Sequence, residues 1–325
     1  MSSRTSDPGL TGDSGFDIVV AGDALIDLTP ATTAEGTLVY EAHPGGSCLN
    51  VAIGLGRLGV PTAFLARLST DGWGQQLRVH LAASGVAPDY IVDTDAVSTL
   101  AAVHLQDGQA TYSFHADGAA DRGLLPEHLP TLPAGATLHL GSIALVLEPV
   151  ASALETLLRR EAGRRVISLD PNIRPGLIPD RDAYVRRFAS WLPSVDLLKL
   201  SQEDLDWLYP GRPRDDVFGA WHEAGVSLVL LTQGGRGARA SARSGSMSVE
   251  APEVAVVDTV GAGDAFMSGA LAHLHHRGQL SPAALGSLDD RSVRGLLEVA
   301  CEVAADTCTR AGAEPPRRSA RAPGP

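Results

Sequence analysis

The stretch DTVGAGDAFMSG, residues 258 to 269, combines three small residues with one acid at the start of a predicted helix. Gly261, Ala262 and Gly263 let backbone N–H groups come close to a ligand, and these groups together with the helix dipole form an anion site. Asp264 follows directly, and a carboxylate beside an anion is suited to take a proton from a hydroxyl that attacks phosphorus. A glycine-rich turn with Asp264 as its N-cap explains the same residues equally well.

Four further groups of polar residues and glycines follow predicted strands. They are Asp27 in GDALIDLTP; Gly45, Gly46 and Asn50 in PGGSCLN; Asp170, Asn172 and Arg174 in LDPNIRPG; and Thr232, Gly234, Gly235 and Gly237 in LVLLTQGGRGA. The PGGSCLN group could bind a small polyol, and a glycine-rich turn after a strand is typical of nucleotide sites. Each group alone is also explained by an ordinary loop or turn. All five groups, however, lie at strand ends of one predicted sheet, the side where open α/β folds bind ligands.

Strands alternate with helices along most of the chain. Strands are predicted within DIVVAG, TAFLARL, TLHLGS, RVISLDPN, DLLKLS and SLVLLTQG, and helices from Asn50 to Gly59 and within GWGQQLRVHLAASGV, PVASALETLLRREAG, AYVRRFASWLPSV and EDLDWLY. This alternation predicts βαβ units and a mostly parallel sheet that is covered by helices on both faces.

Two segments in the first 120 residues break this rhythm. GTLVYEAHPGG and STLAAVHLQDGQATYSFHADG alternate apolar and polar residues, with a turn predicted at Asp107-Gly108. They predict a small antiparallel sheet that stands off the main domain as a lid, with strands within about 28–45 and 97–120; an edge hairpin of the main sheet is the alternative. The predicted domain covers residues 16–316, between disordered tails at 1–15 and 317–325.

Composition and charge argue against several classes of protein. A formal net charge of −12 without an internal Lys/Arg block argues against nucleic-acid binding, and no apolar run reaches the roughly 18 residues of a membrane span. Three cysteines without a CxxC pair, and a beginning without an apolar signal segment, predict a cytoplasmic protein. Lys199 is the only lysine and follows no glycine loop, which excludes a Walker A site, and no HRD or DFG motif of a protein kinase is present.

With these motifs in this order, the chain resembles the ribokinase-like (PfkB) carbohydrate kinases over residues 16 to 316. PGGSCLNVAIGLGRLG lies early and DTVGAGDAFMSG late, and ALIDLTP, GGSCLNVA, DPNIRP and TCTRAGA are most similar to the fructokinase branch. The resemblance implies an α/β fold, a three-layer sandwich with a central, mostly parallel sheet and a small β-sheet lid. It also implies transfer of the γ-phosphate of ATP to a sugar hydroxyl, with Mg²⁺ and, as an option, K⁺.

The resemblance further implies roles for individual residues. Asp264 would be the catalytic base, with Gly261, Ala262 and Gly263 as the anion hole. The sugar would be bound by Asp27, Gly45, Gly46, Asn50 and Arg174. The nucleotide would lie along Ser201, Thr232, Gly234, Gly237 and Cys301. A monovalent cation would be held by Asp258, the carbonyl of Val260 and Gly312, and Asp204 would reach Mg²⁺ through water.

The chain departs from the family pattern at three places. Ser201-Gln202-Glu203-Asp204 replaces the family's Asn-x-x-Glu motif, which predicts an altered magnesium geometry rather than its loss. Cys301 stands where an asparagine is common near the adenine, which weakens the predicted contacts to the base. The lid segment FHADGAAD lacks the arginine that some sugar-acid kinases carry there, and this argues against a carboxylate-bearing substrate.

These features predict an ATP-dependent kinase for a free sugar, with fructose as the first candidate. A kinase for 2-keto-3-deoxygluconate, ribose or a nucleoside is the alternative within the class. A non-catalytic sugar- or nucleotide-binding regulator on the same fold is the alternative from another class. Exposed lid strands could also pair two copies of the chain into a homodimer.

Overall fold

The computed structural model describes residues 15–106 and 109–317. Its strands are β1 (Ile18–Ala21), β2 (Leu25–Thr32), β3 (Leu38–Gly45), β4 (Thr62–Ser69), β5 (Val86–Thr94), β6 (Leu100–Gln106), β7 (Gln109–His115), β8 (Thr137–Gly141), β9 (Ile167–Asp170), β10 (Leu197–Ser201), β11 (Leu228–Thr232), β12 (Ala238–Ala242) and β13 (Gly245–Val249). Its helices are α1 (Ser47–Arg57), α2 (Gly72–Ala83), α3 (Val150–Glu161), α4 (Arg181–Trp191), α5 (Gln202–Leu208), α6 (Arg214–Ala224), α7 (Ala262–His276), α8 (Pro282–Leu285) and α9 (Asp290–Cys308).

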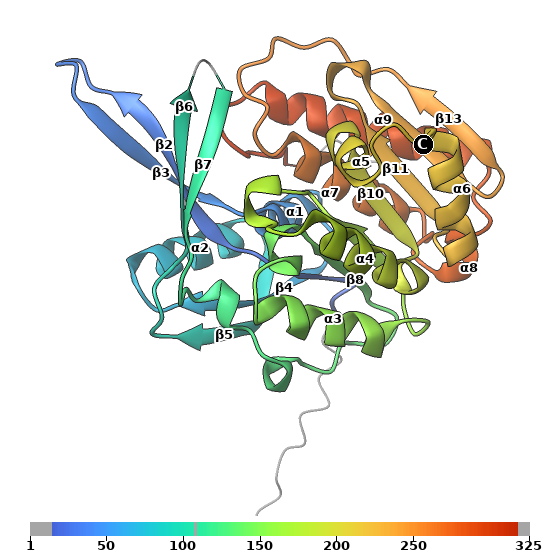
Figure 1. Cartoon of the computed structure of the whole chain (residues 1–325), viewed down its shortest axis with the longest axis horizontal. Coiled ribbons are helices and arrows are strands. Elements are labelled where there is room, and N and C mark those ends of the chain that lie inside the picture. Colours follow the sequence, from blue (N-terminus) through green and yellow to red (C-terminus); the bar gives the residue numbers. More distant parts are fainter. Residues whose placement is uncertain (1–14, 107–108, 318–325) are drawn as a thin grey trace, which may run out of the picture.

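A large sheet forms the centre of the molecule (Figure 1). Among the described residues it contains nine strands, in the order β13-β12-β11-β10-β9-β8-β1-β4-β5. Every pairing from β5 to β11 in this order is parallel, and only the pairings of β12 with β11 and with β13, at one edge, are antiparallel. This confirms the mostly parallel sheet predicted from the alternation of strands and helices. The alternation is the signature of such a sheet, because two parallel neighbours are usually joined by a crossover helix.

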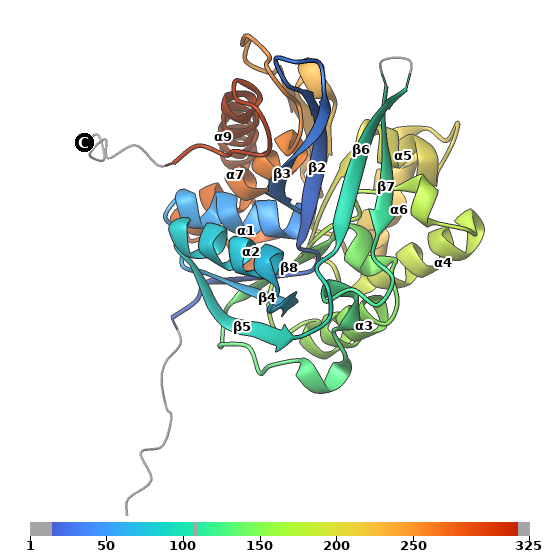
Figure 2. The same cartoon turned by 90° about the vertical axis from the view of Figure 1, so that its left-hand side faces the viewer.

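Helices cover both faces of this sheet and give the molecule three layers (Figure 2). One apolar core lies under α1, α2, α7, α8 and α9, and the other lies under α3, α4, α5 and α6. The strand β1 shows how the sequence serves both layers. Ile18 and Val20 pack into the first core, whereas Val19 and Ala21 pack into the second. Successive side chains of a strand point to opposite faces, so a sheet buried on both sides needs an unbroken apolar run.

A second, smaller sheet stands beside the body in the order β3-β2-β6-β7 (Figure 2). The separate small sheet predicted from the alternating segments is confirmed, and the alternative of an edge hairpin of the main sheet is wrong. It is mixed rather than purely antiparallel, because β2 pairs in parallel with β6. The first of its strands begins at Leu25, slightly before the predicted segment. The predicted turn at Asp107-Gly108 lies outside the described residues.

The helix predicted to start at Asn50 begins three residues earlier, at Ser47. Asp23, which follows β1, supplies the reason. Its carboxylate accepts hydrogen bonds from the backbone N–H groups of Ser47 at 2.8 Å and Cys48 at 3.3 Å, and its carbonyl accepts the N–H of Leu49 at 3.2 Å. The first N–H groups of a helix lack partners within the helix, so these bonds stabilise an additional turn. A cap from a residue this far away in sequence leaves no local signal.

The ends of the chain bear on two other expectations. Residues 1–14 and 318–325, which make up most of the predicted tails, lie outside the described residues, and the predicted limits of the domain stay predictions. Within residues 15–106 and 109–317, no helix has both the length and the apolar character required to cross a membrane.

Candidate active site

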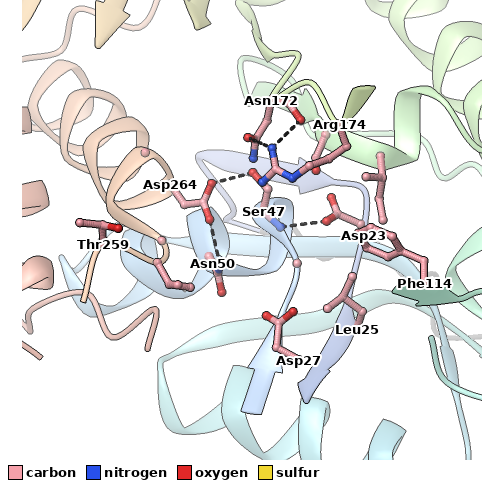
Figure 3. Close-up of a pocket in the computed structure, with 16 residues that line it drawn as sticks. Asp23, Leu25, Asp27, Ser47, Asn50, Phe114, Asn172, Arg174, Thr259 and Asp264 are labelled. Atoms are coloured by element: carbon pink, nitrogen blue, oxygen red, sulfur yellow. Dashed lines mark hydrogen bonds between the residues drawn. The ribbon is translucent and has the colours of Figure 1, made fainter. Parts of the chain in front are cut away.

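A cavity of about 310 Å³ lies at the carboxyl ends of β1, β8 and β9, between the first turn of α7 and the base of the small sheet (Figure 3). Many of the predicted site residues line it together. They are Asp27, Gly46, Asn50, Arg174, Val260, Gly261, Gly263 and Asp264. Strand ends, the small sheet and a helix N-terminus therefore converge on one space, although the residues come from widely separated parts of the sequence.

Asp264 occupies the first turn of α7, whose N-cap is Gly261, so the alternative of an N-cap aspartate is wrong. Its carboxylate accepts a hydrogen bond from Ser47 Oγ at 2.7 Å and another from Asn50 Nδ2 at 2.9 Å (Figure 3). The side chain is buried, and a buried carboxylate requires such partners to stay charged. The carboxylate of Asp264 thus lines the cavity in an orientation fixed by two hydrogen bonds. This is the geometry expected of a group that removes a proton from a bound hydroxyl.

Neighbouring residues leave little room for side chains at the two glycines of the Gly-Ala-Gly run. Gly261 has φ of 74°, and a Cβ atom there would lie 2.4 Å from the Cβ of Ala313. A Cβ atom on Gly263 would lie 3.0 Å from Nζ of Lys199. Both glycines line the cavity, whereas the N–H of Ala262 donates to the carbonyl of Thr259 at 3.2 Å.

Asp27 extends from β2 into the cavity next to Gly45 of the paired strand β3. A Cβ atom on Gly45 would lie only 2.0 Å from Oδ2 of Asp27, so this glycine leaves the room that the carboxylate occupies. Burial, with the nearby charges of Asp23 and Asp264, raises the pKa of Asp27 to about 6. Asp27 therefore carries its charge at neutral pH and gains a proton in mildly acidic solution.

The only lysine of the chain lies directly beside Gly263. Lys199 Nζ donates to Oδ2 of Asp170 at 2.6 Å, and both side chains are almost completely buried. Burial raises the pKa of Asp170 to about 6. Burial alone would lower the pKa of Lys199, but the carboxylate of Asp170 raises it above its usual value. The pair is ionised at neutral pH, and the ammonium end of this ion pair lies beside Gly263 in the first turn of α7.

Arg174 lines the cavity from the loop that follows β9. Its guanidinium group donates to the carbonyl of Asn172 at 3.1 Å, to the side-chain oxygen of Asn172 at 2.7 Å and to the carbonyl of Ile173 at 3.2 Å. Asn172 itself has a left-handed φ of 37°. Arg174 therefore braces a strained loop while presenting a cation to the cavity.

The predicted nucleotide residues lie further along the same edge of the sheet. Ser201 and Thr232 end the neighbouring strands β10 and β11 and are paired in register. Gly234 and Gly237 follow in a short turn, with φ of 57° and 93°. Cys301 differs from these residues, because it is packed in the apolar core under α9, where burial raises the pKa of its thiol to about 11. The predicted position of Cys301 near the adenine of the nucleotide stays a prediction.

Asp204 makes structural contacts that bear on its predicted role toward Mg²⁺. One carboxylate oxygen accepts the N–H of Ile173 at 2.8 Å, and the other accepts the N–H and the hydroxyl of Ser201 at 2.9 and 2.8 Å. The side chain thereby caps α5 and ties it to the loop after β9. Only lone pairs not used in these bonds are left for a metal-bound water.

Asp258 brings the predicted residues for a monovalent cation next to one another. Its carboxylate accepts the N–H of Val260 at 3.0 Å and the N–H of Gly312 at 2.8 Å. These bonds join the loop before α7 to the loop after α9. No cluster of three or more His, Cys, Asp or Glu side chains suited to a metal ion occurs in the described part of the chain.

Seven cavity residues were missed by the sequence analysis, namely Asp23, Leu25, Ser47, Phe114, Ser142, Ile143 and Thr259. Asp23 carries a signal that could have identified it, because it is an acid two residues after a buried strand. Ser142 has a left-handed φ of 60°, a strain that is typical of functional sites but is invisible in a sequence. Phe114 and Ser47 reach the cavity only because of how β7 and α1 pack.

Comparisons with known proteins agree with this geometry. Over residues 16–320 the chain matches the family described as pfkB family carbohydrate kinase. It is 41% identical over 278 residues to a fructokinase of Rhizobium leguminosarum bv. trifolii, an alignment that covers 85% of each chain.

Solved structures show the same likeness. A fructokinase of Xylella fastidiosa with bound ATP superposes with a TM-score of 0.84 at 30% sequence identity, over 91% of this chain and 93% of that chain. A fructokinase double-mutant of Vibrio cholerae O395, in a form with bound fructose, ADP and potassium ion, superposes with a TM-score of 0.80 at 25% identity, over 93% of this chain and 95% of that chain. The chain therefore belongs to the pfkB family of carbohydrate kinases.

Proposed function

We propose that the protein is an ATP-dependent fructokinase, which transfers the γ-phosphate of ATP to a hydroxyl of free fructose. The observation that carries this proposal is the meeting of Asp264, Asp27 and Asn50 in one cavity at the N-terminus of α7. Hydroxyl-binding groups, a base and a site for developing negative charge then lie within the reach of one sugar. The fructokinases that the chain resembles support the choice of substrate.

The proposed reaction is a single displacement at phosphorus. A sugar hydroxyl donates its proton to Asp264 while its oxygen bonds to the γ-phosphorus, and the bond from that phosphorus to the β,γ-bridging oxygen breaks, which releases ADP. Backbone N–H groups around Gly261 and Gly263, with the positive end of α7, stabilise the charge on the transferred group. The ammonium group of Lys199, which is paired with the carboxylate of Asp170, lies beside Gly263 in this turn.

The charges of the cavity favour a neutral substrate. Among the described residues that line it, Asp23, Asp27 and Asp264 are acids and Arg174 is the one Lys or Arg side chain. The N–H groups at the start of α1, a natural anion site, are already used by Asp23. A sugar acid or sugar phosphate would leave its own charge poorly paired, which is costly in a closed site. This favours fructose over 2-keto-3-deoxygluconate.

The small sheet is suited to close over the sugar as a lid. Phe114 of β7 and Leu25 of β2 line the cavity and pack with Ile143 in a small apolar cluster at the base of this sheet. Such a cover excludes water from the reacting phosphate and so limits hydrolysis of ATP.

Two ions belong to the proposed reaction. Mg²⁺ usually keeps several waters and binds through nucleotide phosphates with one or two carboxylates, which fits a chain whose nearby acid, Asp204, is largely occupied. Mg²⁺ would offset phosphate charge. K⁺ fits the loops joined by Asp258, where the carbonyl of Val260 and the loop at Gly312 could supply oxygen ligands.

We also propose a homodimer that forms through the lid strands. Leu38 and Tyr40 on the edge strand β3 are 62% and 44% exposed, an unusual surface for a strand with an open edge. Sedimentation of the wild-type chain and of a variant with Leu38→Glu and Tyr40→Glu tests this: a monomeric wild-type chain would contradict it. We also propose that the reaction takes place in the cytoplasm, and the three free cysteines support this.

A coupled assay of ADP release tests the proposed function. We expect release to depend on fructose and to be small with ribose, nucleosides or no acceptor. A non-catalytic regulator, the alternative from another class, would bind fructose or ATP without producing ADP. The presence of Asp264 in the cavity argues against that alternative.

A further inference from the structure

Both carboxylate oxygens of Asp264 are held by one other helix. Ser47 Oγ donates to Oδ1 at 2.7 Å, and Asn50 Nδ2 donates to Oδ2 at 2.9 Å (Figure 3). The side chains of Ser47, Asn50 and Asp264 are all buried. With a donor on each oxygen, rotation of the carboxylate about its last bond would break two hydrogen bonds.

Ser47 is itself fixed by Asp23. The buried carboxylate of Asp23 accepts the backbone N–H of Ser47 at 2.8 Å, while the side chain of the same serine donates to Asp264. Gly46 precedes this turn with φ of 107°, and a Cβ atom there would lie 2.8 Å from the carbonyl of Asp23. The end of β1, the start of α1 and the start of α7 are therefore joined through one serine.

The packing of α1 against α7 also fixes the distance between the two helices one turn beyond Asn50 and Asp264. A Cβ atom on Gly54 of α1 would lie 2.3 Å from Oγ of Ser268 of α7, so the helices approach as closely as a glycine allows. Interiors packed to this density do not deform easily. The hydroxyl of Ser47 thus meets Asp264 at a distance set by the scaffold.

We propose that Ser47 is a positioning residue, which holds the carboxylate of Asp264 in the orientation that accepts the proton of the substrate hydroxyl. The inference rests on the proposed function, because the orientation matters only if Asp264 acts as the base. The hydroxyl proton of Ser47 is already donated to Asp264, so it is not available to a sugar oxygen. The effect of Ser47 should therefore appear in the chemical step rather than in the binding of the sugar.

The test uses two substitutions at this position and one matched control, measured with fructose and ATP. Ser47→Ala removes the donor, and we expect kcat to fall about 10-fold or more, the usual effect of losing a hydrogen bond to a charged group, with little change in the KM for fructose. Ser47→Thr keeps a hydroxyl and should restore most of kcat. Ser241→Ala deletes another buried serine hydroxyl, which bonds His222 at 2.9 Å far from the cavity, and should leave kcat unchanged.

Several outcomes would overturn the proposal. They are a Ser47→Ala kcat equal to that of the wild type, a loss confined to the KM for fructose, and a Ser47→Thr kcat as low as that of Ser47→Ala. Thermal unfolding and ATP binding of each variant show that the fold is intact. A wild-type protein without fructose-dependent ADP release would instead contradict the proposed function, so the two failures are distinguishable.

Discussion

Asn50 and Asp264 contact each other directly, with 2.9 Å between Nδ2 and Oδ2, although 214 residues separate them in the sequence. The residue predicted to hold the sugar and the residue predicted to accept its proton are therefore parts of one unit. A sugar hydroxyl held by Asn50 would lie next to the base. This contact is the basis of the first prediction.

Asp264→Asn should abolish turnover while leaving ATP binding nearly intact, since it removes the base and keeps the first turn of α7. General-base loss should cost roughly 10²-fold or more in kcat. Steady-state kinetics and ATP titration of the purified variant measure the two quantities. Near-normal turnover by a folded variant would refute the role of Asp264.

The second prediction concerns Gly45 and Asp27. Gly45→Ala introduces a Cβ atom at 2.0 Å from Oδ2 of Asp27, which must displace that carboxylate. We expect kcat/KM for fructose to fall about 10-fold or more, because a charged hydrogen-bond partner is lost, while the affinity for ATP stays the same. Gly219→Ala on α6, where a Cβ atom meets nothing within 4 Å, is the matched control. Equal kinetics of the two variants would remove Asp27 from the sugar site.

The third prediction follows from the raised pKa of Asp27. In the folded protein the pKa of Asp27 is about 6, whereas in the unfolded chain it is near 3.8. Burial and the charges of Asp23 and Asp264 cause the difference, because they disfavour the ionised form. The contribution of Asp27 to the free energy of unfolding is therefore largest below pH 3.8 and is lost as the pH rises to about 6. The Asp27→Asn variant should not lose stability in this way, because an asparagine side chain does not titrate in this range.

Urea unfolding of the wild type and of Asp27→Asn between pH 4 and 7 measures the difference. Relative to the wild type, the variant should gain stability as the pH rises through this window, and a constant difference would contradict the raised pKa. Fructose kcat/KM of the wild type should fall as the pH drops below about 6, because a protonated Asp27 accepts hydrogen bonds poorly.

The fourth prediction concerns the cation site. An ion bound beside Asp258 would order the loop that leads into Gly261 without touching the substrate. Activity should rise when K⁺ replaces a bulky organic cation at constant ionic strength. Asp258→Ala should lose this response, and a flat response of the wild type would remove the site.

The last prediction concerns substrate choice. D-fructose should show a much higher kcat/KM than fructose phosphates or 2-keto-3-deoxygluconate, because the cavity holds three acids against Arg174. Arg57, a cation on the same helix as Asn50, is turned toward Glu314 and Pro315 at the far end of α1 and does not help an anionic substrate. A preference for the sugar acid would reverse both the choice of fructose and the bracing role given to Arg174.

Local patterns in the sequence predicted the layers of the fold and the main motifs. Unbroken apolar runs and helical spacing depend on neighbours a few residues apart, so β1, β4 and α7 are visible without a structure. The hairpin of β12 and β13 was not predicted. Its strands ARASA and GSMSV alternate apolar and polar residues, but they are rich in alanine, serine and glycine and contain almost none of the β-branched and aromatic residues that favour strands. It forms because β11 offers an edge to pair with.

Tertiary structure alone decided how the site is held together. The sequence identified Asp264, Asn50 and Asp27 as candidates, because glycine-rich turns and acids after strands are local signals. It did not show that Asp23 starts α1 at Ser47, that Ser47 and Asn50 both hold Asp264, or that Lys199 stands behind Gly263. Such contacts join residues from different strands and helices, and a hydrogen bond between distant residues leaves no periodic trace in the sequence. They exist only once parallel strands have brought their carboxyl ends to one edge.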